Sequence, residues 1–420
     1  MIFPLGIMRT SNALVCAGFL KRGAIFAVCL FVFCEWFIYY MVILQCSWPV
    51  FTIEEHAKSS EPLRTMLLTD THLLGSKDGH WFDKLRREWQ MERAFQTAVS
   101  YFKPDVIFLL GDLFDEGMKC SDERKNPVKN LHEQTKALTG TQTHKLEWNK
   151  YIQRFHKMFR HSTRTKFYVV VGNHDIGFHY EASGDQHLFQ RFSAEFDSPS
   201  VKLLNIRGNL FVLVNSIALQ GDECSMCSEA MTQLMNVANK LNCHRERSSK
   251  KVYEDVIKKE KKTCDLPKDS PAPILIQHFP LYRRNEVRCT GVDAPPDEEK
   301  RSKNREKWEV VSKEMSQKLL SLLRPRLVLS GHTHHGCYLL HDDGTPEMTI
   351  PSFSWRNRNN PSFVLSVISP EKFALSKCFI PRESTVIAVY IIGGIVFVVM
   401  NFGLTYTSLR TRRKFNSCVR

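Results

Sequence analysis

Five short polar blocks in the 420-residue chain carry side chains that can bind metal ions or transfer protons. The metal-binding side chains in them are carboxylates, imidazoles and one amide, and no block contains a cysteine. The blocks are Asp70-Thr71-His72, Gly111-Asp112, Gly172-Asn173-His174-Asp175, His278 and Gly331-His332-Thr333-His334. This mixture of oxygen and nitrogen donors suits manganese, iron or zinc better than calcium, magnesium or a thiolate-bound metal.

The number of donor side chains fits two metal ions that share one carboxylate. We expect the first ion to be bound by Asp70, His72, Asp112 and His334. We expect the second ion to be bound by Asp112, Asn173, His278 and His332. Two cations about 3.5–4 Å apart need a bridging anion, and a carboxylate together with a hydroxide meets that need.

A structural alternative treats the same residues as buried or capping groups of a domain without activity. Asn and Asp are ordinary helix caps, so the Asn173 and Asp175 positions alone would fit that interpretation. Buried His and Asp side chains without partners are costly, however. Five such blocks in one chain therefore favour a functional centre.

Each polar block follows a hydrophobic segment with the composition of a buried strand. The predicted strands cover residues 63–69, 106–110, 166–171, 273–276 and 327–330. Helices are predicted over residues 88–102, 146–159 and 308–323. Alternating strands and helices are typical of an α/β fold with a parallel sheet, whose sites lie at the carboxyl ends of the strands. The blocks are therefore expected to meet at one edge of a sheet.

Further strands and polar insertions are expected between and after these elements. The additional strands cover residues 201–204, 211–215, 337–340, 349–350 and 363–369, and the last three are expected to close a second sheet. A polar surface loop with partial helix is predicted over residues 119–145, a cysteine-rich insertion over 221–268 and another polar insertion over 283–306.

The chain carries an apolar segment of membrane-spanning length near each end. Residues 23–46 contain one charge, Glu35, and residues 384–406 contain none. Basic residues flank both segments on the side of the chain ends, so the positive-inside rule places both termini in the cytosol. The expected organisation is a cytosolic segment 1–22, a signal anchor 23–46, a lumenal domain 47–383, a second span 384–406 and a basic cytosolic tail 407–420. A cleaved signal peptide is the alternative for the first segment.

The formal charge of +14 suggests acidic partners such as phosphates or anionic lipid. No nucleic-acid-binding motif is present, so we expect no nucleic-acid partner. Four cysteines in the insertion 221–268 form a Cys-x-x-Cys pair and two later positions: Cys224, Cys227, Cys243 and Cys264. In an oxidising lumen, disulfides are expected for these cysteines rather than a zinc knuckle or a redox pair.

The order of the five blocks resembles that of the calcineurin-like metallophosphoesterase family. That family has Asp-x-His, Gly-Asp, Gly-Asn-His-Asp, a lone His and Gly-His-x-His, and every block is present here between Asp70 and His334. The resemblance implies a two-layer β-sandwich flanked by helices, with a dimetal centre at the sheet edge. It also implies hydrolysis of a phosphoric ester.

The dimetal centre suggests roles for the remaining two residues of the third block. Paired cations lower the pKa of a bridging water, and the resulting hydroxide attacks phosphorus in line. His174 is not needed as a ligand, so we expect it to stabilise the transition state or to protonate the leaving alkoxide. Asp175 is expected to orient His174 through a hydrogen bond, with a helix cap as its alternative role.

The two membrane segments and residues 351–363 resemble the membrane-bound branch of this family, which remodels glycosylphosphatidylinositol (GPI) anchors. That branch implies a phosphodiesterase dependent on Mn²⁺ that removes a side-branch ethanolamine phosphate from the GPI glycan. It implies GPI-anchored proteins as substrates, cargo receptors as partners, and a location at ER exit sites, the ER–Golgi intermediate compartment and the Golgi. Trp355, Arg356 and Arg358 are expected either to contact glycan or phosphate or to belong to a packed loop.

Two other functions share these motifs. A phosphatase or phosphodiesterase for another lumenal phosphate ester would have the same ligands, because metal ligands do not report the leaving group. A non-catalytic adaptor that binds cargo would keep the fold, but adaptors of this kind lose ligands. Here every ligand is present, which favours an enzyme.

Overall fold

A computed structural model of the protein describes residues 18, 21–51, 61–75, 79–117, 146–179, 186–220, 225–249, 266 and 270–418. The chain forms two compact units: Ile43–Ile380, and Met1–Val42 together with Pro381–Arg420. The predicted loop 119–145, Cys224 and Cys264 lie outside the described residues, and so does the side chain of Cys243.

The larger unit contains two β-sheets. The first sheet has the strand order β11 (Phe373–Phe379), β10 (Ser362–Ile368), β1 (Leu63–Leu68), β2 (Val106–Leu109) and β3 (Lys166–Val169). The second has the order β4 (Val201–Ile206), β5 (Asn209–Val214), β6 (Ile274–Gln277), β7 (Leu327–Ser330), β9 (Pro346–Thr349) and β8 (Cys337–Leu340). The strands β1, β2 and β3 are parallel, as are β5, β6, β7 and β9. The parallel strands place their carboxyl ends at one edge of each sheet, as predicted.

One hydrophobic core joins the two sheets. Alternate residues of most strands enter it, because successive side chains of a strand point to opposite faces. Leu67 and Phe108 come from the first sheet, and Phe211, Ile276 and Leu329 come from the second. The shared core confirms the predicted two-layer sandwich.

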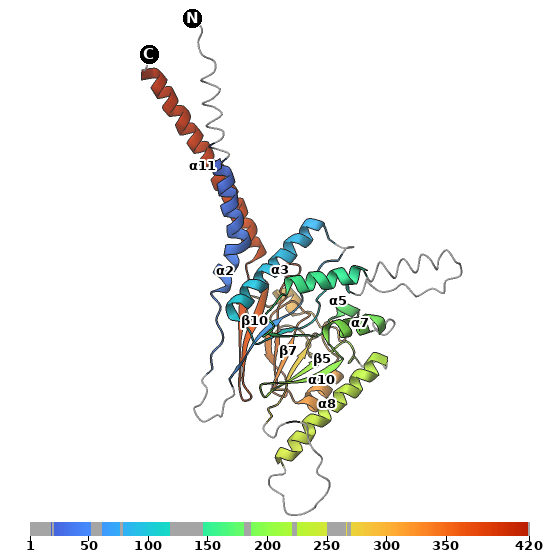
Figure 1. Ribbon diagram of the computed structural model, residues 1–420. Helices are drawn as coiled ribbons and strands as arrows, with labels where there is room; N and C mark the ends of the chain where they lie inside the picture. The colour runs from blue at the N-terminus through green and yellow to red at the C-terminus, as the bar shows by residue number, and fades with distance from the viewer. Residues whose placement is uncertain are drawn as a thin grey trace, which may run out of the picture. The chain divides into compact units, whose positions relative to one another are not determined.

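Helices flank the sandwich in the larger unit. They are α3 (Trp81–Phe102), residues 146–158, α5 (Asn173–Ile176), α7 (Gln186–Phe196), α8 (Ser225–Ser249), α9 (Asp297–Lys300) and α10 (Lys313–Leu323). The buried face of α3 contains Met91, Ala94, Phe95, Ala98 and Phe102, at the spacing of an amphipathic helix. Figure 1 shows α3 outside the sheet that contains β10, whereas α8 lies against β4 and contacts α10.

Some predicted boundaries are wrong. Helix α3 begins at Trp81 rather than at residue 88, because the His80 side chain accepts a hydrogen bond from the Phe82 amide and caps the helix. Helix α10 begins at Lys313 rather than at residue 308, because the Ser312 hydroxyl accepts from the Met315 amide. The cysteine-rich insertion contains α8, a helix of 25 residues that its polar composition did not indicate.

The strand predicted over residues 363–369 does not close the second sheet. It forms β10, which pairs antiparallel with β1 in the first sheet. The following strand β11 was not predicted and extends this sheet further. The second sheet receives only β8 and β9 from the part of the chain after His334.

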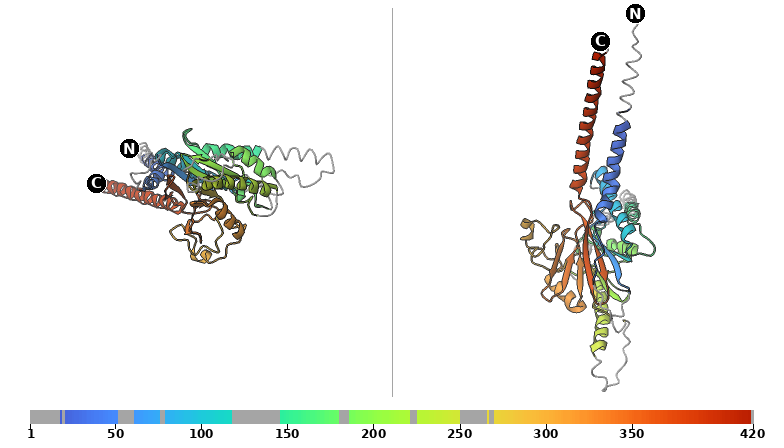
Figure 2. Two further views of the ribbon diagram at one scale, coloured as in Figure 1. Left: turned by 90° about the horizontal axis from the view of Figure 1, so that it is seen from below. Right: turned by 90° about the vertical axis from the view of Figure 1, so that its left-hand side faces the viewer.

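The smaller unit contains two helices that are long and apolar enough to cross a membrane, Lys21–Ile43 and Glu383–Leu404. The second span belongs to α11 (Glu383–Cys418), one continuous helix in Figure 2. The Tyr390 hydroxyl donates a hydrogen bond of 2.6 Å to Glu35, which lies in the π-helical turn η1 (Phe33–Phe37). A Cβ at Gly393 would lie 2.8 Å from the Leu30 side chain, so the two helices approach closely at this glycine.

The first apolar helix ends with α2 (Ile38–Ile43), three residues before the predicted limit at Cys46. Cys46 forms a disulfide with Cys378 of β11, and Cys289 forms one with Cys337 of β8. Cys227 is also disulfide-bonded, as expected for that insertion. Disulfides are typical of oxidising compartments.

Candidate metal centre

The five polar blocks follow the carboxyl ends of β1, β2, β3, β6 and β7. Five residues of these blocks have left-handed backbone conformations, which bulky residues rarely adopt: Asp70 (φ 53°), His72 (φ 44°), Asp112 (φ 51°), His332 (φ 71°) and His334 (φ 60°). Each such residue costs about 1–3 kcal/mol and persists only where the surrounding structure enforces it. This concentration of backbone strain marks the sheet edge as a candidate functional site.

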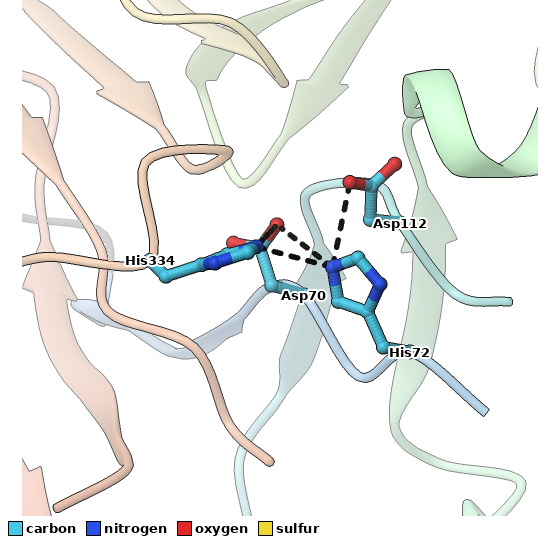
Figure 3. Close-up of side chains that lie close together, drawn as sticks. All are labelled: Asp70, His72, Asp112 and His334. Carbon is cyan, nitrogen blue, oxygen red and sulfur yellow. Dashed lines mark hydrogen bonds and ion pairs between the residues drawn. The ribbon is translucent and has the colours of Figure 1, made fainter. Parts of the chain in front are cut away.

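The first group of donors lies close together at this edge, as Figure 3 shows. The His72 Nε2 atom lies 3.8 Å from Asp70 Oδ1, 3.5 Å from Asp112 Oδ2 and 3.2 Å from His334 Nε2. His334 Nε2 is 3.6 Å from Asp70 Oδ1. These are the four residues that were predicted to surround the first ion, and they come from three different blocks.

The second group shares Asp112 with the first. His278 Nε2 lies 3.2 Å from Asp112 Oδ2 and 3.2 Å from Asn173 Oδ1. His332 offers a ring nitrogen within 4.8 Å of the donor atoms of Asp112 and His278. The structure therefore brings all seven predicted donor residues to one edge of the sandwich, with Asp112 between the two groups.

Three histidines are oriented by a contact of the outer ring nitrogen, the one that faces away from the site. His278 Nδ1 donates to the carbonyl oxygen of Leu110 at 2.6 Å, and His332 Nε2 donates to the carbonyl of Trp308 at 2.6 Å. His72 Nδ1 lies 3.0 Å from the Asp115 carboxylate. A carbonyl oxygen only accepts, so the proton must sit on the outer nitrogen of His278 and His332. The inner nitrogen faces the site and is the atom that would bind a metal ion, as in metal-binding histidines.

In Asp70 and in Asp112, one carboxylate oxygen accepts hydrogen bonds and the other accepts none. Asp70 Oδ2 accepts from the Thr69 hydroxyl at 2.8 Å and from the His332 amide at 3.1 Å, and Asp112 Oδ1 accepts from the His174 amide at 2.8 Å. Asp70 Oδ1, Asp112 Oδ2 and His332 Nδ1 are buried and make no hydrogen bond. Such groups are expensive to bury unless a ligand engages them. Divalent cations would fit this donor set.

The electrostatics of the edge favour positive charge. Burial raises the pKa of Asp112, but the charges of His278 and His174 outweigh burial and hold this pKa well below its usual range. Burial lowers the pKa of His72, but the nearby carboxylates of Asp115 and Asp70 outweigh burial and raise this pKa to about 10. The buried carboxylates thus stabilise any cationic group placed between them.

His174 lies at the open side of the site, with 40% of its side chain exposed. Its Nδ1 donates to the backbone carbonyl of Asp115 at 3.1 Å, and its ring packs edge-on against His72 with centroids 4.6 Å apart. Its Nε2 atom is therefore the nitrogen that can act as an acid or base. Donor atoms of His72, Asp115 and His174 also lie within 4.8 Å of one another, with Asp115 Oδ1 3.0 Å from His72 Nδ1 and 3.9 Å from His174 Nδ1.

Asp115 was not predicted as a site residue. Its carboxylate contacts His72, lies 3.9 Å from His174 Nδ1, and accepts from Arg356 Nη2 at 3.4 Å. Burial raises its pKa, but the hydrogen bond with His72 outweighs burial and lowers this pKa to about 2. Its place three residues after Asp112, in Gly111-Asp112-Leu113-Phe114-Asp115, was the available signal in the sequence.

The predicted hydrogen bond between Asp175 and His174 does not form. Asp175 Oδ1 accepts from the amides of Leu113 (2.9 Å) and Phe114 (3.1 Å), and its Oδ2 accepts from Gly172 (2.8 Å). Asp175 occupies the first turn of α5, where its side chain turns back to the helix start and away from His174. In the structure, Asp175 therefore has its alternative role, that of a helix cap.

A family model described as calcineurin-like phosphoesterase matches residues 63–336. The chain belongs to the calcineurin-like phosphoesterase family. It is similar to Metallophosphoesterase 1 of Gallus gallus, with 45% identity over 91% of this chain and 89% of that protein. It is also similar to Metallophosphoesterase 1 of Danio rerio, with 46% identity over 86% of each chain. This phosphoesterase is therefore a metal-dependent hydrolase, and its fold and donor set support two divalent metal ions.

The solved structures similar to this phosphoesterase are more distant from it. A dimetal phosphatase from Danio rerio covers 77% of this chain and 100% of its own, with 12% identity and a TM-score of 0.38. A purple acid phosphatase from yellow lupin covers 76% of this chain and 51% of its own, with 12% identity and a TM-score of 0.42.

The loop 351–363 of the phosphoesterase combines the two predicted alternatives. Part of it is packed, and one of its arginines can reach a ligand. Trp355 is buried, its amide donates to Gln90, and the Arg86 guanidinium lies over its ring, so it belongs to the packed part of the loop. Arg358 is held against His335. Arg356 is 42% exposed beside Asp115 and the donor groups, which makes it the member of the trio that can reach a ligand.

Proposed function

We propose that this phosphoesterase is a phosphodiesterase that removes a side-branch ethanolamine phosphate from the glycan of GPI anchors. The sequence resemblance of its two membrane segments and its loop 351–363 to the GPI-remodelling branch supports this substrate. A GPI anchor is lipid-bound and confined to one leaflet of a membrane. A catalytic domain with a candidate span at each end is kept beside such a substrate.

We propose that two Mn²⁺ ions occupy the sheet edge. Asp70, His72, Asp112 and His334 would hold the first ion, and Asp112, Asn173, His278 and His332 would hold the second. The observation that carries this assignment is the pair of buried oxygens Asp70 Oδ1 and Asp112 Oδ2, which make no hydrogen bond and face inward-pointing histidine nitrogens. Divalent ions bound there would supply Lewis-acid chemistry and an activated water.

The protein's own residues would orient the ester and transfer the proton. The exposed His174 would protonate the leaving alkoxide from Nε2, because Nδ1 is engaged by the Asp115 carbonyl. Arg356 would contact a non-bridging phosphate oxygen as a charge-assisted donor. Asp175 would act indirectly, by fixing the turn that presents His174 and Asp112.

The proposed location is the lumenal side of ER exit sites, the ER–Golgi intermediate compartment and the Golgi, with both termini in the cytosol. Disulfides between Cys46 and Cys378 and between Cys289 and Cys337 support an oxidising compartment for the domain 47–383. GPI-anchored proteins would be the substrates, and cargo receptors would receive the remodelled product.

The test compares three substrates on the purified full chain in lipid nanodiscs with Mn²⁺. These are a GPI glycan with a side-branch ethanolamine phosphate, a nucleotide and a phosphopeptide. We expect release of ethanolamine phosphate to be the fastest reaction. Faster hydrolysis of either other ester would replace the GPI substrate with another phosphate ester. Binding without turnover of any ester would instead favour a cargo-binding adaptor.

A further inference from the structure

The segment between β6 and α10, residues 283–311, contacts the metal centre. We call it the site insertion. Its Trp308 carbonyl accepts the hydrogen bond of 2.6 Å from His332 Nε2. The Trp308 ring packs on Phe178 with ring centroids 4.6 Å apart, which fixes that end of the insertion beside the site. The orientation of His332 therefore depends on where the site insertion holds one backbone carbonyl.

A buried polar cluster joins the two ends of the site insertion. Glu286 Oε1 accepts from Arg283 Nε at 2.8 Å and from Asn304 Nδ2 at 2.8 Å. Asn304 Nδ2 also donates to the Arg283 carbonyl at 3.1 Å, so three side chains connect the outgoing and returning stretches. Arg283 and Glu286 are each 7% exposed. Only three residues separate Asn304 from Trp308, so this cluster constrains the position of the Trp308 carbonyl.

The same cluster reaches His332 from the strand side. Arg283 Nη1 donates to Thr349 Oγ1 on β9 at 2.9 Å and lies 3.9 Å from the buried Glu347. Glu347 accepts from the Ser330 hydroxyl at 2.7 Å, and Ser330 ends β7 two residues before His332. The backbone of His332 and the carbonyl that orients its ring are thus both tied to one buried network.

Buried ion pairs are poor contributors to stability, because removing two charges from water offsets most of their attraction. The Arg283–Glu286 pair has a clearer role in positioning, because its removal would move the Trp308 carbonyl that orients His332. We infer that Glu286 is a positioning residue for His332 and thereby sets the affinity of the second metal ion. This inference rests on the proposed assignment of His332 as a ligand of that ion.

The test uses the full chain with Glu286→Gln, and Glu298→Gln as its matched control. Glu298 lies on the exposed helix α9 of the same insertion, so its variant makes the same chemical change without touching the cluster. Bound Mn²⁺ per chain is measured by elemental analysis after dialysis against graded Mn²⁺, with thermal unfolding recorded alongside. We expect Glu286→Gln to need about 10-fold more Mn²⁺ to fill the second site, the usual effect of losing an outer contact to a ligand.

The first site should fill at the same Mn²⁺ concentration in both variants, and turnover of Glu286→Gln should recover at saturating Mn²⁺. A variant Asn304→Ala, which keeps the Arg283–Glu286 pair, should show a smaller shift in the same direction. An unchanged second site, or equal weakening of both sites, would overturn the inference. Retention of both ions by His332→Ala would instead refute the ligand assignment, so the two failures can be told apart.

Discussion

Asp112 lies between the two donor groups, since its Oδ2 atom is 3.5 Å from His72 Nε2 and 3.2 Å from His278 Nε2. The change Asp112→Asn leaves the size of the side chain intact but removes the charge that two cations would share. We expect turnover to be abolished and retention of both ions to weaken, as measured by metal content and activity on the same preparation. Near-normal turnover with two ions bound would contradict the bridging role.

His174 should separate catalysis from metal binding. The variant His174→Ala should keep both ions and lose about 10²–10⁴ in rate, because it removes a positioned proton donor. The loss should be smaller for an aryl diester, whose leaving group needs no proton. Metal content and turnover on an alkyl and an aryl diester measure this difference, with His332→Ala as the comparison that loses metal and affects both esters alike.

Either of two results would exclude the leaving-group role of His174. One is loss of an ion from His174→Ala, which would make His174 a ligand. The other is an equal rate defect on both diesters, which would place its effect before or after proton transfer.

The sequence was sufficient to group the candidate metal donors. It was not sufficient to predict which way the neighbouring side chains point. Polar residues after buried strands must meet where parallel strands end, so Asp70, Asp112 and His278 could be grouped from their positions. The partner of His174 could not be found in this way. It depends on the directions in which the side chains of Asp115 and Asp175 point, and Asp175 points toward backbone amides instead.

At the scale of elements, Asp175 joins the start of α5 to the loop after β2. It accepts from the amides of Leu113, Phe114 and Gly172, and a Cβ at Gly172 would lie 2.2 Å from the Asp112 amide nitrogen. The variant Asp175→Asn places an amide group against one of these donors. We expect a loss of about 1–3 kcal/mol in unfolding free energy, measured by urea denaturation of the metal-free protein.

A companion measurement distinguishes this structural role from a catalytic one. The pH dependence of turnover should keep its shape in Asp175→Asn, because Asp175 does not contact the His174 ring. A shifted profile with unchanged stability would restore Asp175 as the residue that orients His174.

Local patterns located most strands, but they could not assign every strand to a sheet. The run 363–369 has the composition of a buried strand, and β10 is where it was expected. Its partner β1 lies about three hundred residues earlier, with Leu67 opposite Val364, a pairing that no local pattern reports. Helix α8 was missed for a related reason, because only part of its surface is buried and its apolar stripe is weak.

At the scale of the whole molecule, the two apolar helices lie on either side of the larger unit in the sequence. We expect both termini in the cytosol, because Lys21 and Arg22 lie at the start of the first helix and the basic residues from Arg410 onward follow the second span, Glu383–Leu404. Protease treatment of intact microsomes should remove tags at either end and leave a tag between the helices intact. Protected ends with a cleaved central tag would reverse this topology.

The disulfide between Cys46 and Cys378 has a sequence separation of 332 and closes almost the entire larger unit, Ile43–Ile380, into a covalent ring. In the chain-entropy description, closing a loop of this length disfavours the unfolded chain by about 6 kcal/mol. The ring also changes what limited proteolysis can do. One cut inside it yields two fragments that remain joined through sulfur, each with one of the candidate spans. A nicked molecule would therefore stay on its membrane in one piece and separate only on reduction.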